Sequence, residues 1–290
     1  MSLTSDPGPS PISPAARRPI RNVTGTAFVV AEFRAEENYA AHPLYRDPIV
    51  HMFLDEASRQ AAARVAAGFP PMREMVKVRT KYFDDMLERQ LFCGCRQVVV
   101  LGAGLDTRAV RKSAPGVTYF EIDDEATLSL KEDRLEARGI RTKARFIAGN
   151  YVTDGLIELL TRHGFDLDLP TYIIWEGNTM YLPLETDKAI IVELRDNLRN
   201  FRLSFDYLAK AVITKTTSEI GLTRMAEGFA DLGAPWITGF DNIRDLAAEL
   251  RLRVIDNFTS GDLYRRYRVR DSSERPIFGP YYSVCTLGSR

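Results

Sequence analysis

The chain is poor in cysteine and histidine, with three of each among its 290 residues. Three cysteines provide no disulfide framework, a pattern typical of the reducing cytoplasm, where we expect the protein to reside. Cys93 and Cys95 are separated by one glycine, and such a pair does not by itself make a zinc site. The histidines show no metal-ligand spacing (His42, His51 and His163), so we predict no metal centre.

An excess of charge of one sign and long apolar runs are also missing. The 39 Lys and Arg residues equal the 39 Asp and Glu residues, so there is no basic field of the kind that favours nucleic acid. No apolar run approaches the ~20 residues that cross a bilayer, and residues 1–19 lack the apolar core of a secretion signal. Their Pro, Ser and Gly content predicts a disordered leader. We expect neither a nucleic acid nor a membrane as partner.

Short apolar runs alternate with helical patterns along the rest of the chain. Apolar periodicity predicts strands at 97–101, 117–122, 144–148, 171–175, 201–207, 252–258 and 281–287. Helices are predicted at 24–66 with breaks at Pro43 and Pro48, at 72–92, from about 107, at 124–138, at 153–163, after Pro183, and over most of 208–250. This alternation predicts an α/β fold, a doubly wound, seven-stranded, mostly parallel sheet with helices on both faces. The last two strands lack a clear crossover helix, which predicts an antiparallel C-terminal hairpin around a loop at 262–279.

We expect an N-terminal helical cap at 20–92 and a main domain at 93–290, with a helical insertion at 208–250. An acceptor pocket is expected between residues 20–75 and this insertion, which carries aromatic side chains. Trp236 and Phe240 lie four residues apart in the insertion, a spacing typical of a helical core stripe.

The most informative segment joins the first two predicted strands. The apolar run at 98–101 leads into Gly102-Ala103-Gly104, and the next strand ends at Asp123, 21 residues after Gly102. A spacing of ~20 residues is typical of nucleotide-binding α/β units, in which glycines admit the ligand and the acid accepts hydrogen bonds from ribose hydroxyls. The alternative for Asp123 is an acid that only favours the start of the following helix.

The glycine turn favours an adenosine cofactor without a phosphate grip. The sixth position of a G-x-G-x-x-G pattern is Thr107, so the third glycine of a dinucleotide cradle is missing. No phosphate-binding G-x-x-x-x-G-K-[ST] loop occurs either. A nucleoside with an amino-acid tail fits this pattern, and S-adenosylmethionine is such a ligand. An NAD-dependent oxidoreductase with a degenerate fingerprint remains the alternative.

Several segments resemble the leucine carboxyl methyltransferase family, and more narrowly its bacterial polyketide and natural-product O-methyltransferases. They are Arg79–Asp84, Gln97–Arg108, Phe120–Asp123, Trp175–Pro183 and Leu203–Tyr207. The resemblance runs from about Gly25 to the C-terminus. The combination of the glycine turn with Glu-Gly-x-x-Met-Tyr-Leu is what makes it specific.

The resemblance implies a class I methyltransferase that binds S-adenosylmethionine. Its implied cofactor-binding residues are Arg79 for the methionyl carboxylate, Gly102, Ala103 and Gly104 in the turn, Asp123 for the ribose, and Glu176 beside the methionine moiety. Asn150 and Tyr151 stand where the family often has Asp-Leu near the adenine, and they still offer an amide and an aromatic ring. For Arg108 and Asp106 we expect a structural pair that fixes the turn.

The sequence indicates methyl transfer but leaves the acceptor open. We expect O-methylation of a carboxylate or hydroxyl of a small molecule, in secondary metabolism. Tyr181 is the candidate catalytic residue at the transfer centre, and a core aromatic is the alternative reading of this position. No His lies in the motif segments, which favours an acceptor already ionised or one activated by Glu176. A protein C-terminal carboxylate as acceptor, and a non-catalytic binding protein with this fold, also remain open.

Overall fold

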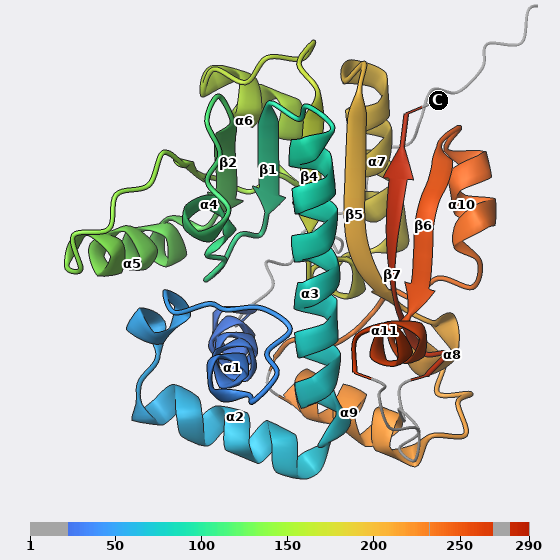
Figure 1. Cartoon of the computed structure of the whole chain (residues 1–290). Helices are drawn as coiled ribbons and strands as arrows, with labels where there is room; N and C mark the ends of the chain where they lie inside the picture. The colour runs from blue at the N-terminus through green and yellow to red at the C-terminus, as the bar shows by residue number, and fades with distance from the viewer. Residues whose placement is uncertain (1–22, 232, 269–278, 290) are drawn as a thin grey trace, which may run out of the picture.

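The computed structural model describes residues 23–231, 233–268 and 279–289, and within them a seven-stranded sheet with helices on both faces (Figure 1). The strands are β1 (Gln97–Leu101), β2 (Thr118–Asp123), β3 (Arg145–Ala148), β4 (Thr171–Trp175), β5 (Phe201–Leu208), β6 (Arg253–Thr259) and β7 (Tyr282–Gly288). Their order is β3-β2-β1-β4-β5-β7-β6, and β7 runs antiparallel to both of its neighbours. The predicted fold class is confirmed.

The helices follow the predicted alternation. They are α1 (Val23–Glu36), α2 (Glu56–Gly68), α3 (Pro71–Phe92), α4 (Arg108–Arg111), α5 (Glu125–Glu136), α6 (Leu156–Arg162), α7 (Leu184–Asn197), α8 (Lys210–Ile213), α9 (Ile220–Asp231), α10 (Ile243–Glu249) and α11 (Ser260–Tyr267), with 3-10 turns η2 (Glu37–Tyr39), η3 (Val50–Phe53) and η4 (Thr179–Tyr181). Residues 40–49, which contain Pro43 and Pro48, form no helix. Helix α2 then starts at a capping box in which Asp55 and Ser58 bond each other's backbone N–H groups.

Strand β1 lies inside the sheet and is buried on both faces. Val99 and Leu101 pack in the apolar cluster with α6, α7 and α10, whereas Val98 and Val100 pack with α3 and α11. A parallel strand covered on both sides reads as a continuous apolar run rather than an alternating one. This is why the segment before the glycine turn could be recognised from sequence.

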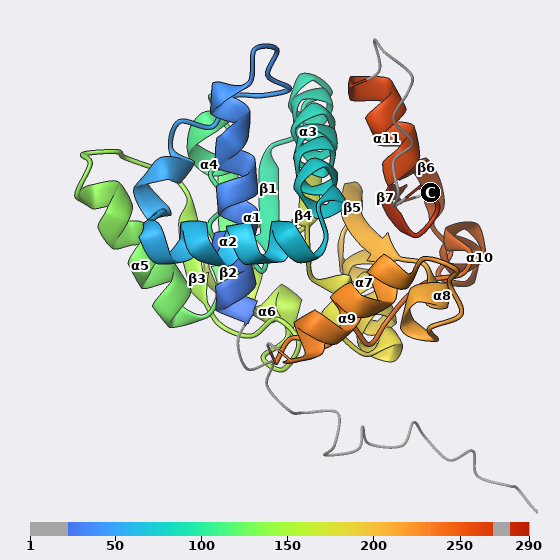
Figure 2. The ribbon, with the colours of Figure 1, turned by 90° about the horizontal axis from the view of Figure 1, so that it is seen from below.

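Helices α1, α2 and α9 form a cap at the carboxyl ends of the parallel strands (Figures 1 and 2). Although α9 lies far from α1 and α2 in sequence, the three helices share one apolar cluster with η4 and the end of β5. Its members include Val29, Phe33, Ala66, Met72, Met75, Tyr181, Leu208, Leu222, Met225 and Phe229. In the sheet topology this is the edge at which ligands of open α/β folds bind.

Two local predictions are wrong. Trp236 and Phe240 do not share a helix, because α9 ends at Asp231 and the segment that carries them is not helical. Pro235 disfavours a helix there, and Gly239 passes so close to the backbone of Lys210 that a Cβ would lie 2.9 Å from it.

The second concerns helix α11, because the loop expected at 262–279 begins within it. The helix expected from about 107 is present as α4, which spans four residues. The β6–β7 pairing is antiparallel as predicted. The leader at 1–19 lies outside the described residues.

Candidate functional site

The glycine turn after β1 is bonded directly to the acid at the end of β2. The backbone N–H of Gly104 donates to Asp123 Oδ2 at 2.6 Å, and that of Asp124 donates to Asp123 Oδ1 at 2.7 Å. Gly102 and Gly104 have φ angles of 61° and 47°, a conformation that other residues rarely adopt. Burial raises the pKa of Asp123 to about 6, against the two N–H donors, which lower it. Ala103 is buried within the turn.

The turn after β4 packs on the glycine turn. A Cβ at Gly102 would lie 2.8 Å from Cγ of Asn178, whose amide donates to the carbonyl oxygens of Glu176 at 2.8 Å and Leu101 at 3.2 Å. On the other side, the Cβ of Ala27 in α1 lies 3.6 Å from where a Cβ of Gly104 would be. Cap and sheet therefore meet at the segment that the sequence singled out.

Arg79 projects from α3 and is held by groups from the turn after β4 and from strands β5 and β7. Its Nε donates to Glu176 Oε1 at 2.8 Å, and its Nη1 donates to Asp206 Oδ2 at 3.1 Å and to Tyr282 Oη at 2.8 Å. The Tyr282 hydroxyl in turn donates to Asp206. Nη2 makes no hydrogen bond to the residues that the structure describes, and lies 3.8 Å from the Cβ position of Gly177.

Glu176 bridges Arg79 to a second buried arginine, Arg108. Arg108 Nη1 donates to Glu176 Oε2 at 2.8 Å and to Asp106, and Arg108 Nε donates to Asp84 at 2.7 Å. The expected pair of Arg108 and Asp106 is thus present. Burial acts to raise the pKa of Glu176, but Arg108 and Arg79 outweigh it and hold that pKa below its usual range. Glu176 therefore carries a negative charge at neutral pH.

The other predicted site residues, Asn150, Tyr151 and Tyr181, range from exposed to buried. Asn150 is exposed, and its side-chain oxygen accepts from the N–H of Val152 at 3.0 Å. Tyr151 is half-buried, with its ring edge-on to Trp175; its hydroxyl accepts from Trp175 Nε1 at 3.1 Å and donates to Asn178 at 3.3 Å. Tyr181 is buried in the apolar cluster of the cap, which raises its pKa.

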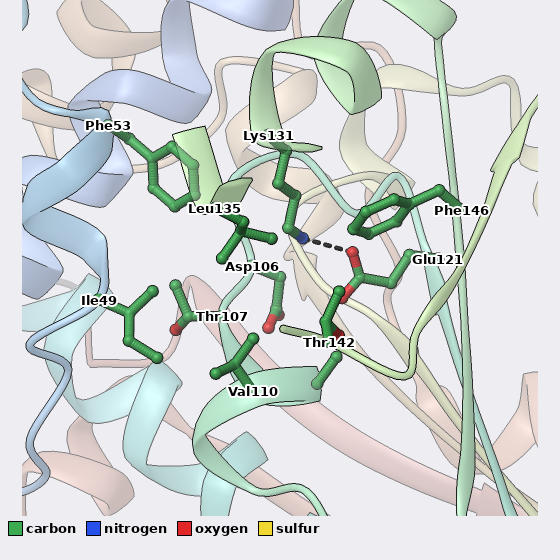
Figure 3. Close-up of a pocket in the computed structure, with 11 residues that line it drawn as sticks. Ile49, Phe53, Asp106, Thr107, Val110, Glu121, Lys131, Leu135, Thr142 and Phe146 are labelled. Atoms are coloured by element: carbon green, nitrogen blue, oxygen red, sulfur yellow. Dashed lines mark hydrogen bonds and ion pairs between the residues drawn. The ribbon is translucent and has the colours of Figure 1, made fainter. Parts of the chain in front are cut away.

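A separate buried ion pair joins α5 to β2 (Figure 3). Lys131 of α5 binds Glu121 of β2, and both side chains are almost fully buried. Asp106 and Thr107 line the same narrow crevice from the segment that follows the turn. The pair anchors α5 to the strand that carries Asp123.

Sequence reasoning missed Asp206, Tyr282 and Asn178 as parts of this site. The signal for Asp206 is an acidic residue inside strand β5, where every residue except Arg202 is buried. Tyr282 carries no such signal, because an aromatic at the start of a strand is common. Among the described residues no group of three or more His, Cys, Asp or Glu side chains is placed to hold a metal ion, and no helix has the length and apolar character of a membrane span.

A family model described as leucine carboxyl methyltransferase matches residues 27–194. A protein of Saccharopolyspora erythraea named "Putative S-adenosyl-L-methionine-dependent methyltransferase" is 33% identical over 194 residues, or 64% of this chain and 68% of the relative. A relative of the same name from Mycobacteroides abscessus is 36% identical over 188 residues, or 58% of this chain and 59% of the relative. The match thus spans about three fifths to two thirds of these relatives.

Solved structures show the same fold. A DUF574 family protein from Streptomyces avermitilis superimposes with a TM-score of 0.67 at 12% identity, covering 91% of this chain and 97% of that one. A "putative methyltransferase" from Thermobifida fusca gives a TM-score of 0.57 at 16% identity, covering 81% and 89%. The family model covers more than half of the sequence, including the glycine turn, Asp123 and Glu176, and the chain therefore belongs to the leucine carboxyl methyltransferase family.

Proposed function

We propose that the protein is an S-adenosylmethionine-dependent O-methyltransferase. The observation that carries this proposal is the bond that joins the glycine turn to Asp123. Buried Arg79, whose Nη2 bonds to none of the described residues, supports it. Each oxygen of Asp123 accepts one N–H and keeps lone pairs for ribose hydroxyls. Nη2 of Arg79 keeps two N–H groups, which are proposed to donate charge-assisted hydrogen bonds to the methionyl carboxylate.

The remaining residues fit the rest of this ligand. Glu176 keeps its charge between two arginines and would border the cationic methionine moiety. Asn150 and Tyr151, on the turn after β3, are proposed to border the adenine. S-adenosylmethionine supplies the methyl group on a sulfonium that already makes a good leaving group, so the protein contributes mainly proximity and orientation.

Tyr181 is proposed to face the transfer centre from η4, beneath the cap. Burial raises the pKa of Tyr181, so its hydroxyl keeps its proton at neutral pH and acts as a hydrogen-bond donor rather than as a base. A donor suits an acceptor that is already anionic, and a carboxylate is ionised at pH 7. We therefore place a small-molecule carboxylate ahead of a hydroxyl as the acceptor. The apolar cap cluster would exclude water around it.

The test is transfer of a labelled methyl group into panels of small carboxylic acids, phenols and peptides. Incorporation into acids with little into phenols is the expected result. Incorporation only into peptide C-termini would replace the small-molecule acceptor by a protein. A parallel thermal-shift series compares S-adenosylhomocysteine with NAD, because a specific ligand raises the melting temperature. Stabilisation by NAD alone would refute the proposal, and cofactor binding without transfer to any acceptor would favour a non-catalytic binding protein.

A further inference from the structure

The guanidinium of Arg79 is held from one side by an interlocked pair of side chains. Tyr282 lies opposite Leu208 in the antiparallel pairing of β5 with β7, which makes it a diagonal neighbour of Asp206 on the same face of the sheet. Its hydroxyl accepts from Arg79 Nη1 and donates to Asp206 Oδ2, which also accepts from Arg79 Nη1. The three groups form a closed triangle with no exposed member.

Asp206 also fixes the turn that carries Glu176. Its Oδ1 accepts from the N–H of Gly177 at 2.6 Å, and its carbonyl oxygen accepts from the hydroxyl of Thr179 at 2.6 Å. One carboxylate thus orients both the guanidinium and the loop that presents Glu176 to the same guanidinium. Asp206 of β5 therefore fixes the position of Arg79 relative to the turn after β4. Neither α3 nor β4 alone determines this position.

We propose that Asp206 and Tyr282 are positioning residues for the cofactor carboxylate: they occupy Nη1 of Arg79 and so direct Nη2 towards the ligand. This inference rests on the proposed function. Arg79 offers five N–H groups in a rigid fork, and three are used by Glu176, Asp206 and Tyr282. Without the pair, Nη1 would be free to compete for Glu176 or the ligand, and the planar fork would lose its fixed rotation.

Three variants and two ligands separate this role from a merely structural one. Tyr282→Phe removes the hydroxyl, and Asp206→Asn removes the charge while keeping the shape. Tyr207→Phe is the matched control. Tyr207 is the residue after Asp206 in β5 and is also a buried tyrosine. Its hydroxyl donates to Asn257 at 2.9 Å, away from Arg79. The ligands are S-adenosylhomocysteine, which has the amino-acid tail, and 5′-methylthioadenosine, which shares the adenosine but has no carboxylate.

We expect Tyr282→Phe and Asp206→Asn to weaken S-adenosylhomocysteine binding about 10-fold or more in calorimetry, the scale of a lost hydrogen bond to a charged group. Binding of 5′-methylthioadenosine should stay within about 2-fold, and Tyr207→Phe should change neither ligand. In turnover assays the same two variants should raise KM for the methyl donor more than they lower kcat. Unfolding curves for all variants report any general loss of structure.

An equal loss for both ligands, or no loss for either, would overturn the positioning role. If one of the two variants fails to fold, the other variant decides, through its affinities for the two ligands. The Arg79→Ala variant distinguishes failure of the positioning role from failure of the proposed function on which it rests. If Arg79→Ala abolishes S-adenosylhomocysteine binding while both positioning variants bind normally, only the positioning role fails. If Arg79→Ala also binds normally, the proposed carboxylate site itself is wrong.

Discussion

Asp187 is a buried acid without a hydrogen-bond partner among the described residues, so the native residue weakens the fold at this position. Asp187 lies in the first turn of α7, on the face that carries the buried Ile190 and Ile191. It is 0% exposed, and neither of its carboxyl oxygens bonds to any residue that the structure describes. Burial raises the pKa of Asp187 well above its usual value, and no cation in the described part of the chain opposes this.

Replacing Asp187 by leucine should therefore stabilise the protein. An unsatisfied buried polar group costs about 1–3 kcal/mol, and an apolar side chain of similar size removes that cost. We expect the free energy of unfolding of Asp187→Leu to exceed that of the native chain by at least about 1–3 kcal/mol at pH 7.

The pH dependence gives the sign of the effect. In the unfolded chain an aspartate loses its proton near pH ~4, whereas the folded chain keeps the proton on Asp187 to a higher pH. Between those two pKa values the unfolded state binds fewer protons, so stability from this group falls as pH rises, by at most ~1.4 kcal/mol per unit. The advantage of Asp187→Leu should accordingly be larger at pH 7.5 than at pH 5.

Urea unfolding followed by circular dichroism at pH 5 and pH 7.5 measures both quantities. Glu185→Gln is the matched control, since Glu185 is an acid in the same helical turn with a side chain that is 83% exposed. The control should shift stability by less than ~0.5 kcal/mol. A destabilised Asp187→Leu, or an advantage that does not grow with pH, would refute the reasoning.

Three further predictions concern the glycine turn and its surroundings. Gly102→Ala should abolish S-adenosylhomocysteine binding in calorimetry, because a Cβ would meet Asn178 at a φ of 61°; a variant with native affinity would show that the turn does not need glycine. Affinity for the same ligand should fall as pH drops through about 6, where Asp123 gains a proton, and an Asp123→Asn variant should bind weakly with no step there; a step that persists in the variant belongs to another group. Lys131→Met leaves Glu121 buried without its cation and should lower the free energy of unfolding by about 3–5 kcal/mol in urea titrations, so a loss below ~1 kcal/mol would mean that Glu121 is easily neutralised.

The sequence predicted the structure best where the local residue pattern matches the burial of the segment in the sheet. Strands β1 and β4 match the predicted residues because each is an apolar run bounded by turn-forming residues and buried on both faces. The segment around Trp236 was misread because a four-residue spacing fits a helix as well as two unrelated packing sites, one on Phe229 and one beside the end of β5.

Contacts between distant segments could not be read from the sequence. Asp206 and Tyr282 stand 127 and 203 positions after Arg79, and only the pairing of β5 with β7 brings them to it. The glycine turn and the acid at the end of β2, by contrast, can be recognised from sequence because they belong to one short β-α-β segment. The predicted contact residues could therefore be proposed from local motifs, whereas the groups that orient Arg79 depend on the fold.

The placement of β7 has a consequence for how the protein is made. This strand inserts between β5 and β6, so β6 cannot join the sheet until residues 282–288 have been synthesised. During translation the growing chain can form the parallel strands β1 to β5 while the edge of β5 stays unpaired and Arg79 lacks the hydroxyl of Tyr282. A ribosome-bound chain that ends before residue 282 should then expose the unpaired edge of β5, which is prone to aggregation. The protein should therefore depend most on a chaperone before β7 has been synthesised.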